Sequence, residues 1–305
     1  MLSALVLALP ALAACAAMPA VLEERQSCPN IHIFGARETT TPQGYGSSST
    51  VVNDVLNAYP GSTAEALVYP ACGGQSSCGG VSYANSAAQG TSTAASDINA
   101  YVAKCPNTQI VLVGYSQGGQ VFDNVVCGGG DAAEGISSTA VPLTAAAQAA
   151  VKAVILMGDP RYVYGFSYEV GTCRAGGFDA RSSSFQCPVG NKIQSYCDSA
   201  DPYCCNGNDA NVHQGYGAEY GQAALTFIKS KLSSSSGSAP VSSTVAHSSA
   251  TSAPHSSTAV SSAQPTSTSV GSSGSVPKYG QCSATKGCVA GTTCKYMNPY
   301  YSQCL

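Results

Sequence analysis

The sequence predicts an α/β fold with a mainly parallel sheet and helices on both faces. Short β-rich runs alternate with longer stretches of small residues that suit helices, and this alternation is typical of parallel sheets. Near residue 113 an apolar run also passes through a glycine-containing turn into a helical stretch. We expect strands at 31–34, 66–69, 109–113, 151–156 and 192–196, and helices at 51–58, 83–104, 118–126 and 215–231. Functional side chains should lie just beyond the carboxyl ends of the strands.

The first residues have the pattern of a signal peptide. Residues 1–14 form an apolar run that ends in small residues, and this run is too short and wrongly flanked for a membrane span. We expect cleavage by Ala20, and residues 21–26 suit a short propeptide, so that the mature chain begins near Ser27. Because no later stretch is long and apolar enough to span a bilayer, a soluble, secreted protein is expected.

Fifteen cysteines in 305 residues point to an oxidising compartment. Removing Cys15 with the signal leaves fourteen of the fifteen, an even number that can pair completely. A zinc site is the alternative, but the spacing does not favour it, because no Cys-x-x-Cys pair recurs and few histidines are available. We therefore expect disulfides, with no metal and no cofactor.

The chain is nearly neutral. Its formal net charge is −3, and only 10% of its residues are charged. Such a chain offers no basic surface for the electrostatic capture of nucleic acid or anionic lipid, so neither nucleic acid nor a membrane is an expected partner. A neutral polymer is the more natural one.

Residues 233–276 are expected to link two domains. They are almost wholly Ser, Thr, Ala, Val and Pro, without an aromatic residue, and cannot bury a core. In an exported protein such a stretch suits an extended, O-glycosylated linker. It divides a large domain at 27–232, long enough for one core, from a small one at 277–305, which is too short to fold without its four cysteines.

The turn at Ser116 has the Gly-x-Ser-x-Gly pattern, between an apolar strand and a helix that begins near Gly118. In this context the serine occupies a strained turn, and the small residues two positions before and after it let the strand and the helix approach closely. The pattern predicts a nucleophilic serine on an α/β-hydrolase type of fold. The alternative is a glycine-rich turn with a surface serine, which the strand-turn-helix context disfavours.

A serine nucleophile needs a base, and the chain has four histidines. His247 and His255 fall in the linker. His32 lies in an apolar strand before the serine, where a buried, hydrogen-bonded core role is expected. His213 follows Ser116 in a polar loop before the last helix, in the order serine, acid, histidine of this type of fold. We therefore interpret His213 as the base.

Seven aspartates lie between Ser116 and His213, so several residues are candidates for the acid. Asp201 follows the last predicted strand in a loop with cysteines on both sides, and such stapling would fix the carboxylate that orients the histidine. We prefer Asp201, and Asp198 and then Asp159 remain the alternatives.

An oxyanion that forms at the serine needs two or more hydrogen-bond donors. The backbone N–H of Gln117, directly after the serine, is one donor by the logic of the motif. We expect the loop 35–40, after the first strand, to supply the other.

These residues make the large domain resemble the fungal acetylxylan esterases, which share a family with the cutinases. The resemblance covers 27–232 and is carried by the segments 28–40, 69–78, 114–119, 201–205 and 213–215. It implies a three-layer α/β/α sandwich of cutinase-like type, a triad of Ser116, Asp201 and His213, and oxyanion donors at Thr39 and Gln117. It also implies the disulfides Cys28–Cys105, Cys72–Cys78, Cys127–Cys187, Cys173–Cys205 and Cys197–Cys204.

Ten cysteines and Tyr203 resemble the acetyl esterases of this family more than its cutinases. Our hypothesis is that Tyr203 contacts the substrate and narrows the acyl site, so that acetyl groups fit and long chains do not. The resemblance implies removal of acetyl groups from acetylated xylan of plant cell walls, through an acyl-enzyme on Ser116, by a monomeric protein. The alternatives are a cutinase or short-chain lipase, and a non-enzymatic wall-binding protein.

The small domain resembles fungal-type cellulose-binding modules, which are small disulfide-rich β structures. We expect aromatic rings to stack on glucose and amide side chains to bind at the rim: Tyr279, Tyr300 and Tyr301, and Gln281, Asn298 and Gln303. The resemblance implies the disulfides Cys282–Cys294 and Cys288–Cys304. The segment between Cys282 and Cys288 is shorter than is usual in that family, which puts the affinity in doubt. The alternative is that the tyrosines fill a small core.

Overall fold

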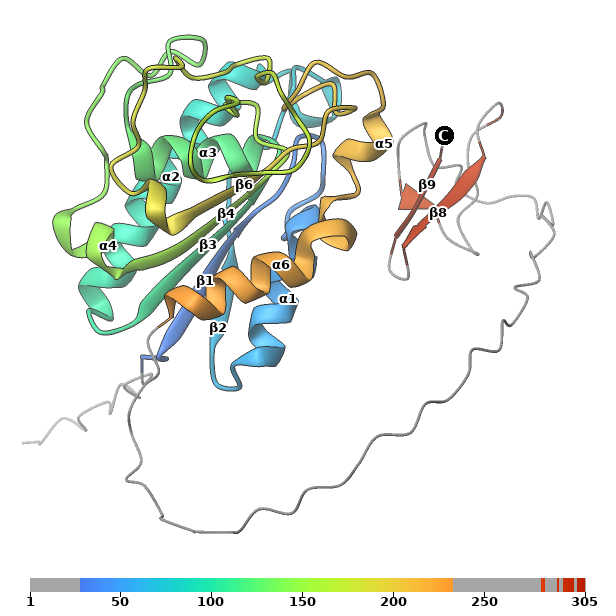
Figure 1. Ribbon diagram of the computed structural model, residues 1–305. Coiled ribbons are helices and arrows are strands. Elements are labelled where there is room, and N and C mark those ends of the chain that lie inside the picture. The colour runs from blue at the N-terminus through green and yellow to red at the C-terminus, as the bar shows by residue number, and fades with distance from the viewer. Residues whose placement is uncertain (1–27, 233–280, 283–289, 291–292, 299–300, 305) are drawn as a thin grey trace, which may run out of the picture.

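The computed structural model describes residues 28–232 and, near the carboxyl terminus, 281–282, 290, 293–298 and 301–304 (Figure 1). Residues 1–27 and 233–280 lie outside this part, so the predicted signal peptide and linker stay predictions. None of the helices in the described part is both long and apolar enough for a membrane span.

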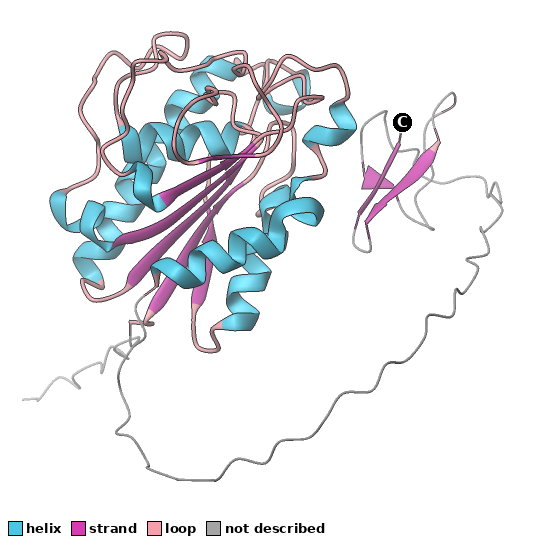
Figure 2. Ribbon diagram, in the orientation of Figure 1, coloured by secondary structure: helices cyan, strands magenta, loops and turns pink. Residues whose placement is uncertain are grey.

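A six-stranded sheet forms the centre of residues 28–232, and all of its strand pairs are parallel. The strands, in the order β2-β1-β3-β4-β6-β5 across the sheet, are β1 Ile31–Ala36, β2 Thr63–Ala66, β3 Gln109–Tyr115, β4 Val151–Met157, β5 Glu169–Val170 and β6 Ile193–Tyr196. Figure 2 shows the long loops gathered beyond the carboxyl ends of these strands. We call this side of the sheet the catalytic edge and the opposite side the amino edge.

Helices cover both faces of the sheet. They are α1 Ser49–Ala58, α2 Tyr83–Lys104, α3 Gln117–Cys127, α4 Ala145–Ala150, α5 Ala210–His213 and α6 Tyr216–Lys231, with 3₁₀ turns at Gly46–Ser48, Ser76–Cys78 and Gly190–Lys192. Alternate residues of β3 serve two cores, because successive side chains of a strand point to opposite faces. Ile110 and Leu112 pack with α2, α3 and α4, whereas Val111 and Val113 pack with α1 and α6. The result is the expected three-layer α/β/α sandwich.

The ends of the 28–232 segment both lie at the amino edge. Strand β1 begins there, close to residue 28, and α6 runs back from the catalytic edge to end beside the start of β1 (Figure 1). Ile31 and Leu232 belong to the same buried cluster.

The strand predicted at 66–69 is wrong, because β2 lies at 63–66. Strand β2 is at the edge of the sheet and its residues are exposed or half-buried, so it carries no apolar signal. The apolar signal comes instead from Leu67 and Tyr69, which are buried beyond the end of the strand. There Arg37 donates hydrogen bonds to the carbonyl of Tyr69 at 2.6 Å and to that of Leu67 at 3.4 Å. Helices α4 and α5 and strand β5 were not predicted, and α5 lies in the stretch before the last helix that was expected to be a polar loop.

Five disulfides tie this domain together. They are Cys28–Cys105, Cys72–Cys78, Cys127–Cys187, Cys173–Cys205 and Cys197–Cys204, the same pairs that the resemblance implies. Cys28–Cys105 joins the start of β1 to the end of α2, far along the chain, whereas Cys197–Cys204 closes a short loop after β6.

Three short strands form a separate antiparallel sheet near the carboxyl terminus. In the order β7-β9-β8 they are β7 Gln281–Cys282, β9 Tyr301–Cys304 and β8 Cys294–Asn298. The backbone register places Gln281 opposite Gln303, and Asn298 opposite Tyr301. Tyr279, Tyr300 and Cys288 lie outside the described residues, so the proposed sugar-binding face and its two disulfides stay predictions.

Candidate active site

Ser116 lies at the sharp turn between β3 and α3, at the catalytic edge. Its backbone has φ 52° and ψ −119°, in a region that residues other than glycine seldom adopt. The turn is held by the N–H of Ser116, which donates to the carbonyl of Met157 at the end of β4 (2.8 Å). The side chain is largely enclosed, since the residue is 8% exposed. A strained, anchored serine of this kind is typical of a nucleophile elbow.

The two glycines of the motif are required by close backbone contacts. A Cβ on Gly114 would lie 2.4 Å from the carbonyl oxygen of Gly118, and a Cβ on Gly118 would lie 2.4 Å from that of Ala36. No side chain fits at either position without moving the backbone. The strand, the helix and the end of β1 can therefore converge around Ser116 only with glycine at both places.

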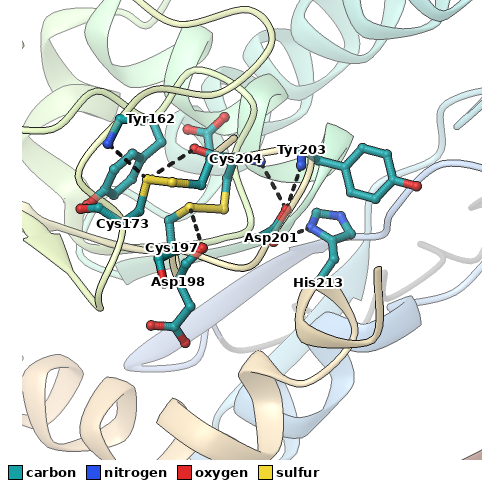
Figure 3. The surroundings of a disulfide bond; sticks show 12 residues. Tyr162, Cys173, Cys197, Asp198, Asp201, Tyr203, Cys204 and His213 are labelled. Carbon is teal, nitrogen blue, oxygen red and sulfur yellow. Dashed lines mark hydrogen bonds and ion pairs between the residues drawn. A yellow bond between two sulfur atoms is a disulfide. The ribbon is translucent and has the colours of Figure 1, made fainter. Parts of the chain in front are cut away.

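His213 and Asp201 form a buried hydrogen-bonded pair at the same edge (Figure 3). Nδ1 of His213, the last residue of α5, lies 2.7 Å from Oδ2 of Asp201, in the loop after β6. The hydroxyl of Tyr216 donates to the same oxygen at 2.7 Å. The other oxygen, Oδ1, accepts the N–H groups of Tyr203 (2.6 Å) and Cys204 (3.1 Å). Asp201 is thus fixed on both sides.

These contacts keep Asp201 ionised although it is completely buried. Burial acts to raise the pKa of its carboxyl, but the hydrogen bond and charge of His213 and the donors Tyr203 N–H and Tyr216 hydroxyl outweigh burial, and the net effect lowers the pKa. An ionised carboxylate at Nδ1 orients the imidazole so that Nε2 is left to accept a proton.

Neighbouring residues fix the position of His213. The hydroxyl of Tyr115 donates to the carbonyl of His213 at 2.7 Å. Gly158, which has a positive φ of 67°, lies against the imidazole, because a Cβ there would be 2.6 Å from Cε1 of the ring. The ring of Tyr203 lies 4.5 Å from the imidazole, between centroids, and its hydroxyl is turned away from Asp201 (Figure 3).

The other candidate acids have different partners. Asp198 accepts hydrogen bonds from Thr172 and Tyr220. Asp159 accepts the N–H of Arg161 at 2.9 Å. Of the three aspartates considered from the sequence, it is Asp201 that bonds to His213.

His32 has a different environment from His213. Its Nδ1 shares a hydrogen bond with the hydroxyl of Thr63 at 2.6 Å, and its ring stacks on Tyr101 at 4.0 Å. Burial lowers the pKa of His32 to about 4. The residue therefore has the buried, hydrogen-bonded role that its apolar strand predicts.

The expected oxyanion donors lie on two segments. Gln117 is the first residue of α3, where a helix leaves its N–H without an intrahelical acceptor. Its side chain is turned inward, since Oε1 accepts from Ser86 (2.8 Å) and Nε2 donates to the carbonyl of Cys72 (3.1 Å). Thr39 lies in the loop after β1. This loop packs against the segment around Gly73, because the Thr39 methyl group would lie 3.1 Å from a Cβ built on Gly73.

A buried cluster of acidic and arginine side chains lies under the loops after β4 and β5. It contains Asp123, Asp131, Glu134, Asp159 and Asp179 with Arg161 and Arg181. Carboxylate oxygens of Asp131, Glu134 and Asp179 lie close enough together for a metal ion. Nε2 of Gln120 already donates to all three, and Arg161 pairs with two of them. The cluster therefore works as an internal ion-pair network.

The cavity of about 320 Å³ found in this domain does not involve the paired residues. It lies between α2, the end of α3 and the loop after α3, and its lining includes Thr91, Asn124 and Ile136. Ser116, His213 and Asp201 lie at the catalytic edge of the sheet, outside the lining of this cavity.

Sequence reasoning missed Tyr115, Gly158 and Tyr216, which fix His213 and Asp201. Tyr115 sits directly before Ser116, and Gly158 directly follows the strand after the serine, so proximity to the motif was the available signal for both. Tyr216 is three residues after His213, but no local pattern shows that its hydroxyl reaches Asp201.

Comparison with known proteins identifies the family. A family model described as Cutinase matches residues 27–232. The chain is 69% identical to Cutinase 11 of Verticillium dahliae, over 76% of this chain and 77% of that protein. It is 57% identical to Acetylxylan esterase of Hypocrea jecorina, over 92% of this chain and 90% of that protein.

A solved structure gives the same result for the fold. The catalytic core domain of acetyl xylan esterase from Trichoderma reesei is 67% identical and matches with a TM-score of 0.67. The match covers 68% of this chain and 100% of that one. The chain therefore belongs to the acetylxylan esterase and cutinase family and is a carboxylic ester hydrolase.

Proposed function

We propose that this esterase removes acetyl groups from acetylated xylan, with Ser116 as nucleophile, His213 as base and Asp201 as the acid that orients it. The observation that carries the proposal is the buried hydrogen bond of 2.7 Å between His213 and Asp201, at the same edge of the sheet as the strained Ser116. The substrate is supported by the similarity to a relative named as an acetylxylan esterase and to the solved core domain of an acetyl xylan esterase.

The reaction follows from these groups. The hydroxyl of Ser116 attacks the acetyl carbonyl while Nε2 of His213 takes its proton, and Asp201 stabilises the imidazolium that forms. Thr39 and the N–H of Gln117 donate to the oxyanion. Collapse of the tetrahedral intermediate expels the sugar hydroxyl, which receives its proton from His213. Water then gives a proton to the same histidine as it attacks the acyl-enzyme, and acetate leaves while His213 returns that proton to the Ser116 oxygen.

The test is acetate release from acetylated xylan, with Ser116→Ala as the control. We expect release by the wild-type chain and a loss of about three or more orders of magnitude in the variant, because removal of a nucleophile leaves only residual catalysis. An active Ser116→Ala variant would reject the assignment of the nucleophile.

Tyr203 is proposed to restrict the acyl site to short groups. The support is its position, with the ring 4.5 Å from the imidazole and 42% of the residue exposed. Wild-type protein should cleave nitrophenyl acetate far better than nitrophenyl laurate, and Tyr203→Ala should narrow that difference. Equal efficiency of the wild-type chain on both esters would contradict the proposal.

A cutinase-type activity on lipid polyesters is the second candidate. It is favoured by the 69% identity to a protein named Cutinase 11. The acyl-length comparison separates the two, because a cutinase must accept long aliphatic acyl groups, whereas a site narrowed at Tyr203 must not.

The domain arrangement is also a proposal: a signal peptide at 1–20 with a propeptide up to 26, the esterase at 27–232, a glycosylated linker at 233–276 and a cellulose-binding module at 277–305 of a secreted monomer. Support comes from the alignment with the Hypocrea jecorina relative, which extends over 288 residues and 92% of this chain and is therefore longer than the esterase domain. The three-stranded antiparallel sheet at 281–304 also suits such a module.

Cellulose anchoring can be tested on the full chain. We expect retention on microcrystalline cellulose and its loss when Tyr300 and Tyr301 are changed to Ala. Acetate release from soluble acetylated xylan should stay the same in that double variant. Unchanged retention of the variant would contradict the proposed aromatic face.

A further inference from the structure

Exposed large apolar side chains of the described residues gather at the catalytic edge. They are Val68, Tyr164, Phe178 and Tyr203, with exposed fractions of 42% to 68%. Each lies in a loop after the carboxyl end of a strand: β2, β4, β5 and β6, respectively. Single exposed apolar residues are ordinary, so each of the four has to be judged by its own contacts.

The backbone of Phe178 is hydrogen-bonded to that of Tyr203, the residue proposed to line the acyl site. Its N–H donates to the carbonyl of Tyr203 at 3.0 Å, and the ring of Tyr203 in turn lies 4.5 Å from the imidazole of His213. Phe178 is 57% exposed, more than Tyr203. Phe178 is therefore connected to Tyr203 through the backbone, and Tyr203 contacts His213, the base of the proposed triad, through its ring.

The ring of Phe178 packs against the ring of Tyr83. Its edge-to-face contact with Tyr83 has a centroid distance of 5.5 Å and an interplanar angle of 72°. Tyr83 is fixed in turn, because its hydroxyl donates to Oε1 of Gln120 at 2.7 Å. An exposed ring with such support loses little conformational entropy when a ligand binds to it.

The backbone on both sides of Phe178 is also fixed. A Cβ on Gly177 would lie 2.1 Å from the carbonyl oxygen of Pro160, so the two loops are in direct contact. The N–H of Asp179 donates to the same carbonyl at 3.2 Å. The carboxylate of Asp179 accepts from Arg161 at 3.1 Å and from Gln120 at 2.6 Å. The buried ion-pair network thus supports the loop that presents Phe178.

We infer that Phe178 is a substrate-positioning residue whose ring stacks on a pyranose ring of the polysaccharide, next to the sugar that carries the acetyl group. The inference rests on the proposed activity on acetylated xylan. The axial C–H groups of a sugar carry a small positive charge and the face of an aromatic ring is negative, so the two faces attract and exclude water. The hydroxyl of Tyr203 is turned away from Asp201 (Figure 3).

The test compares a polymeric with a small substrate. Phe178→Ala should raise KM for acetylated xylan by about fivefold to tenfold with little change in kcat, the range expected from loss of one aromatic stacking contact. Nitrophenyl acetate, which has no sugar, should be cleaved at a rate within about twofold of wild type. Phe178→Trp should restore the KM for the polymer.

Tyr164→Ala is the matched control. Tyr164 is exposed to a similar extent at the same edge, but its ring lies 4.9 Å from the guanidinium of Arg174, which also donates to its hydroxyl at 2.9 Å. We expect this variant to keep the wild-type KM for acetylated xylan. An increase equal to that of Phe178→Ala would overturn the assignment to Phe178.

The remaining outcomes separate this inference from the activity on which it rests. If the wild-type chain releases no acetate from xylan, both fail. If it does so and Phe178→Ala has an unchanged KM for the polymer, the stacking inference alone fails. An equal loss on xylan and nitrophenyl acetate would also overturn it, because that result would mean that Phe178 acts by placing Tyr203 and His213.

Discussion

At the scale of single residues, the hydrogen bonds to Asp201 decide how His213 is held. Both carboxylate oxygens are occupied, and the hydroxyl of Tyr216 shares Oδ2 with the imidazole. The imidazole itself is confined by Gly158 on one side and by the ring of Tyr203 on another. Because each contact restricts a different movement of the carboxylate or the imidazole, substitutions of Tyr216 and of Gly158 should have different effects on the pH profile and on kcat.

Tyr216→Phe should reduce kcat/KM by about tenfold, the order expected from loss of one hydrogen bond to a charged group. Without the hydroxyl, the pKa of Asp201 should rise, because this donor favours the ionised carboxylate. The acid limb of the pH profile should move to higher pH as a result. The measurement is kcat/KM for nitrophenyl acetate between pH 3 and pH 8.

Tyr220→Phe provides the control for Tyr216→Phe. The hydroxyl of Tyr220 donates to Asp198 at 3.0 Å, so the substitution removes a similar hydrogen bond from a neighbouring carboxylate. We expect its pH profile to match that of the wild type. An acid limb that moves equally in both variants would show that the effect is not specific to Asp201.

Gly158→Ala should reduce kcat by about a hundredfold or more, since misplacement of a catalytic group by about 1 Å has effects of this size. The added Cβ would overlap the imidazole of His213, and circular dichroism should show a retained fold. Gly135→Ala is the matched control, because Gly135 has a similar φ of 75° but open space around its Cβ position. Full activity of Gly158→Ala would contradict the role given to this contact.

The residues of the site differ in how far the sequence predicts them. Ser116 stands in a local strand-turn-helix pattern, and His213 is reached by elimination among four histidines. Asp201 could not be separated from Asp198 and Asp159 in this way, because the choice depends on which carboxylate the fold brings to Nδ1. The hydroxyl of Tyr216 carried no local signal, since Tyr in a helix is usually a packing residue.

At the scale of elements, the loops after β4 and β5 depend on buried charges. Five carboxyl groups share two guanidinium groups in the network beneath them. Burial and the carboxylate of Asp131 raise the pKa of Asp179 from 3.8 to about 7, although Arg161 acts in the opposite direction. The loop that carries Phe178 is therefore sensitive to pH through the residue beside it.

The contribution of Asp179 to stability should be lost as the pH rises from about 4 to about 7, whereas His32, whose pKa burial lowers to about 4, should act in the opposite direction between pH 4 and about 6.5. In this range the folded state keeps the proton on Asp179 that the unfolded state has released, so a higher pH favours unfolding. The loss attributable to this group should be roughly 1 to 4 kcal/mol. Denaturant unfolding at several pH values measures it.

Asp179→Asn should remove the loss of stability that is attributable to this group, because the neutral amide has no proton to lose. Glu134 and Asp159, whose pKa values are also raised by burial, should maintain part of the slope. Glu219→Gln, on the exposed side of α6, serves as the control and should leave the slope unchanged. If the free energy of unfolding of Asp179→Asn depends on pH as it does in the wild type, groups other than Asp179 take up the protons.

The elements also show why β2 was misplaced while β3 and β4 were not. Strands β3 and β4 lie in the middle of the sheet and are almost fully buried, so their sequences are continuous apolar runs. Strand β2 lies at the edge, and its burial is partial. Apolar residues indicate which positions are buried, but they do not show whether a buried position lies in a strand. Leu67 and Tyr69 are buried in a loop.

At the scale of the whole molecule, disulfides have two distinct uses. Cys28–Cys105 closes a long loop between the start of β1 and the end of α2, away from the catalytic edge. Cys197–Cys204 closes a short loop that contains Asp201 and sits beside it (Figure 3). A long loop restricts the unfolded chain strongly, whereas a short one mainly holds local geometry.

Removal of the two bridges should therefore separate stability from activity. Changing Cys28 and Cys105 to Ser should lower the free energy of unfolding by about 4 kcal/mol with little effect on kcat/KM. Changing Cys197 and Cys204 to Ser should cost less stability but reduce kcat/KM by about tenfold or more. The same effect of both changes on kcat/KM would contradict the distinction.

The position of the two ends of the 28–232 segment has a practical consequence. Because both lie at the amino edge, opposite the proposed active site, a solid support coupled at either end would meet the side of the molecule away from that site. An immobilised layer joined through Leu232 would point its reactive side toward the solution. The arrangement suits a reusable biocatalyst for bulky polymers, whose acetyl groups could reach the serine without passing the support.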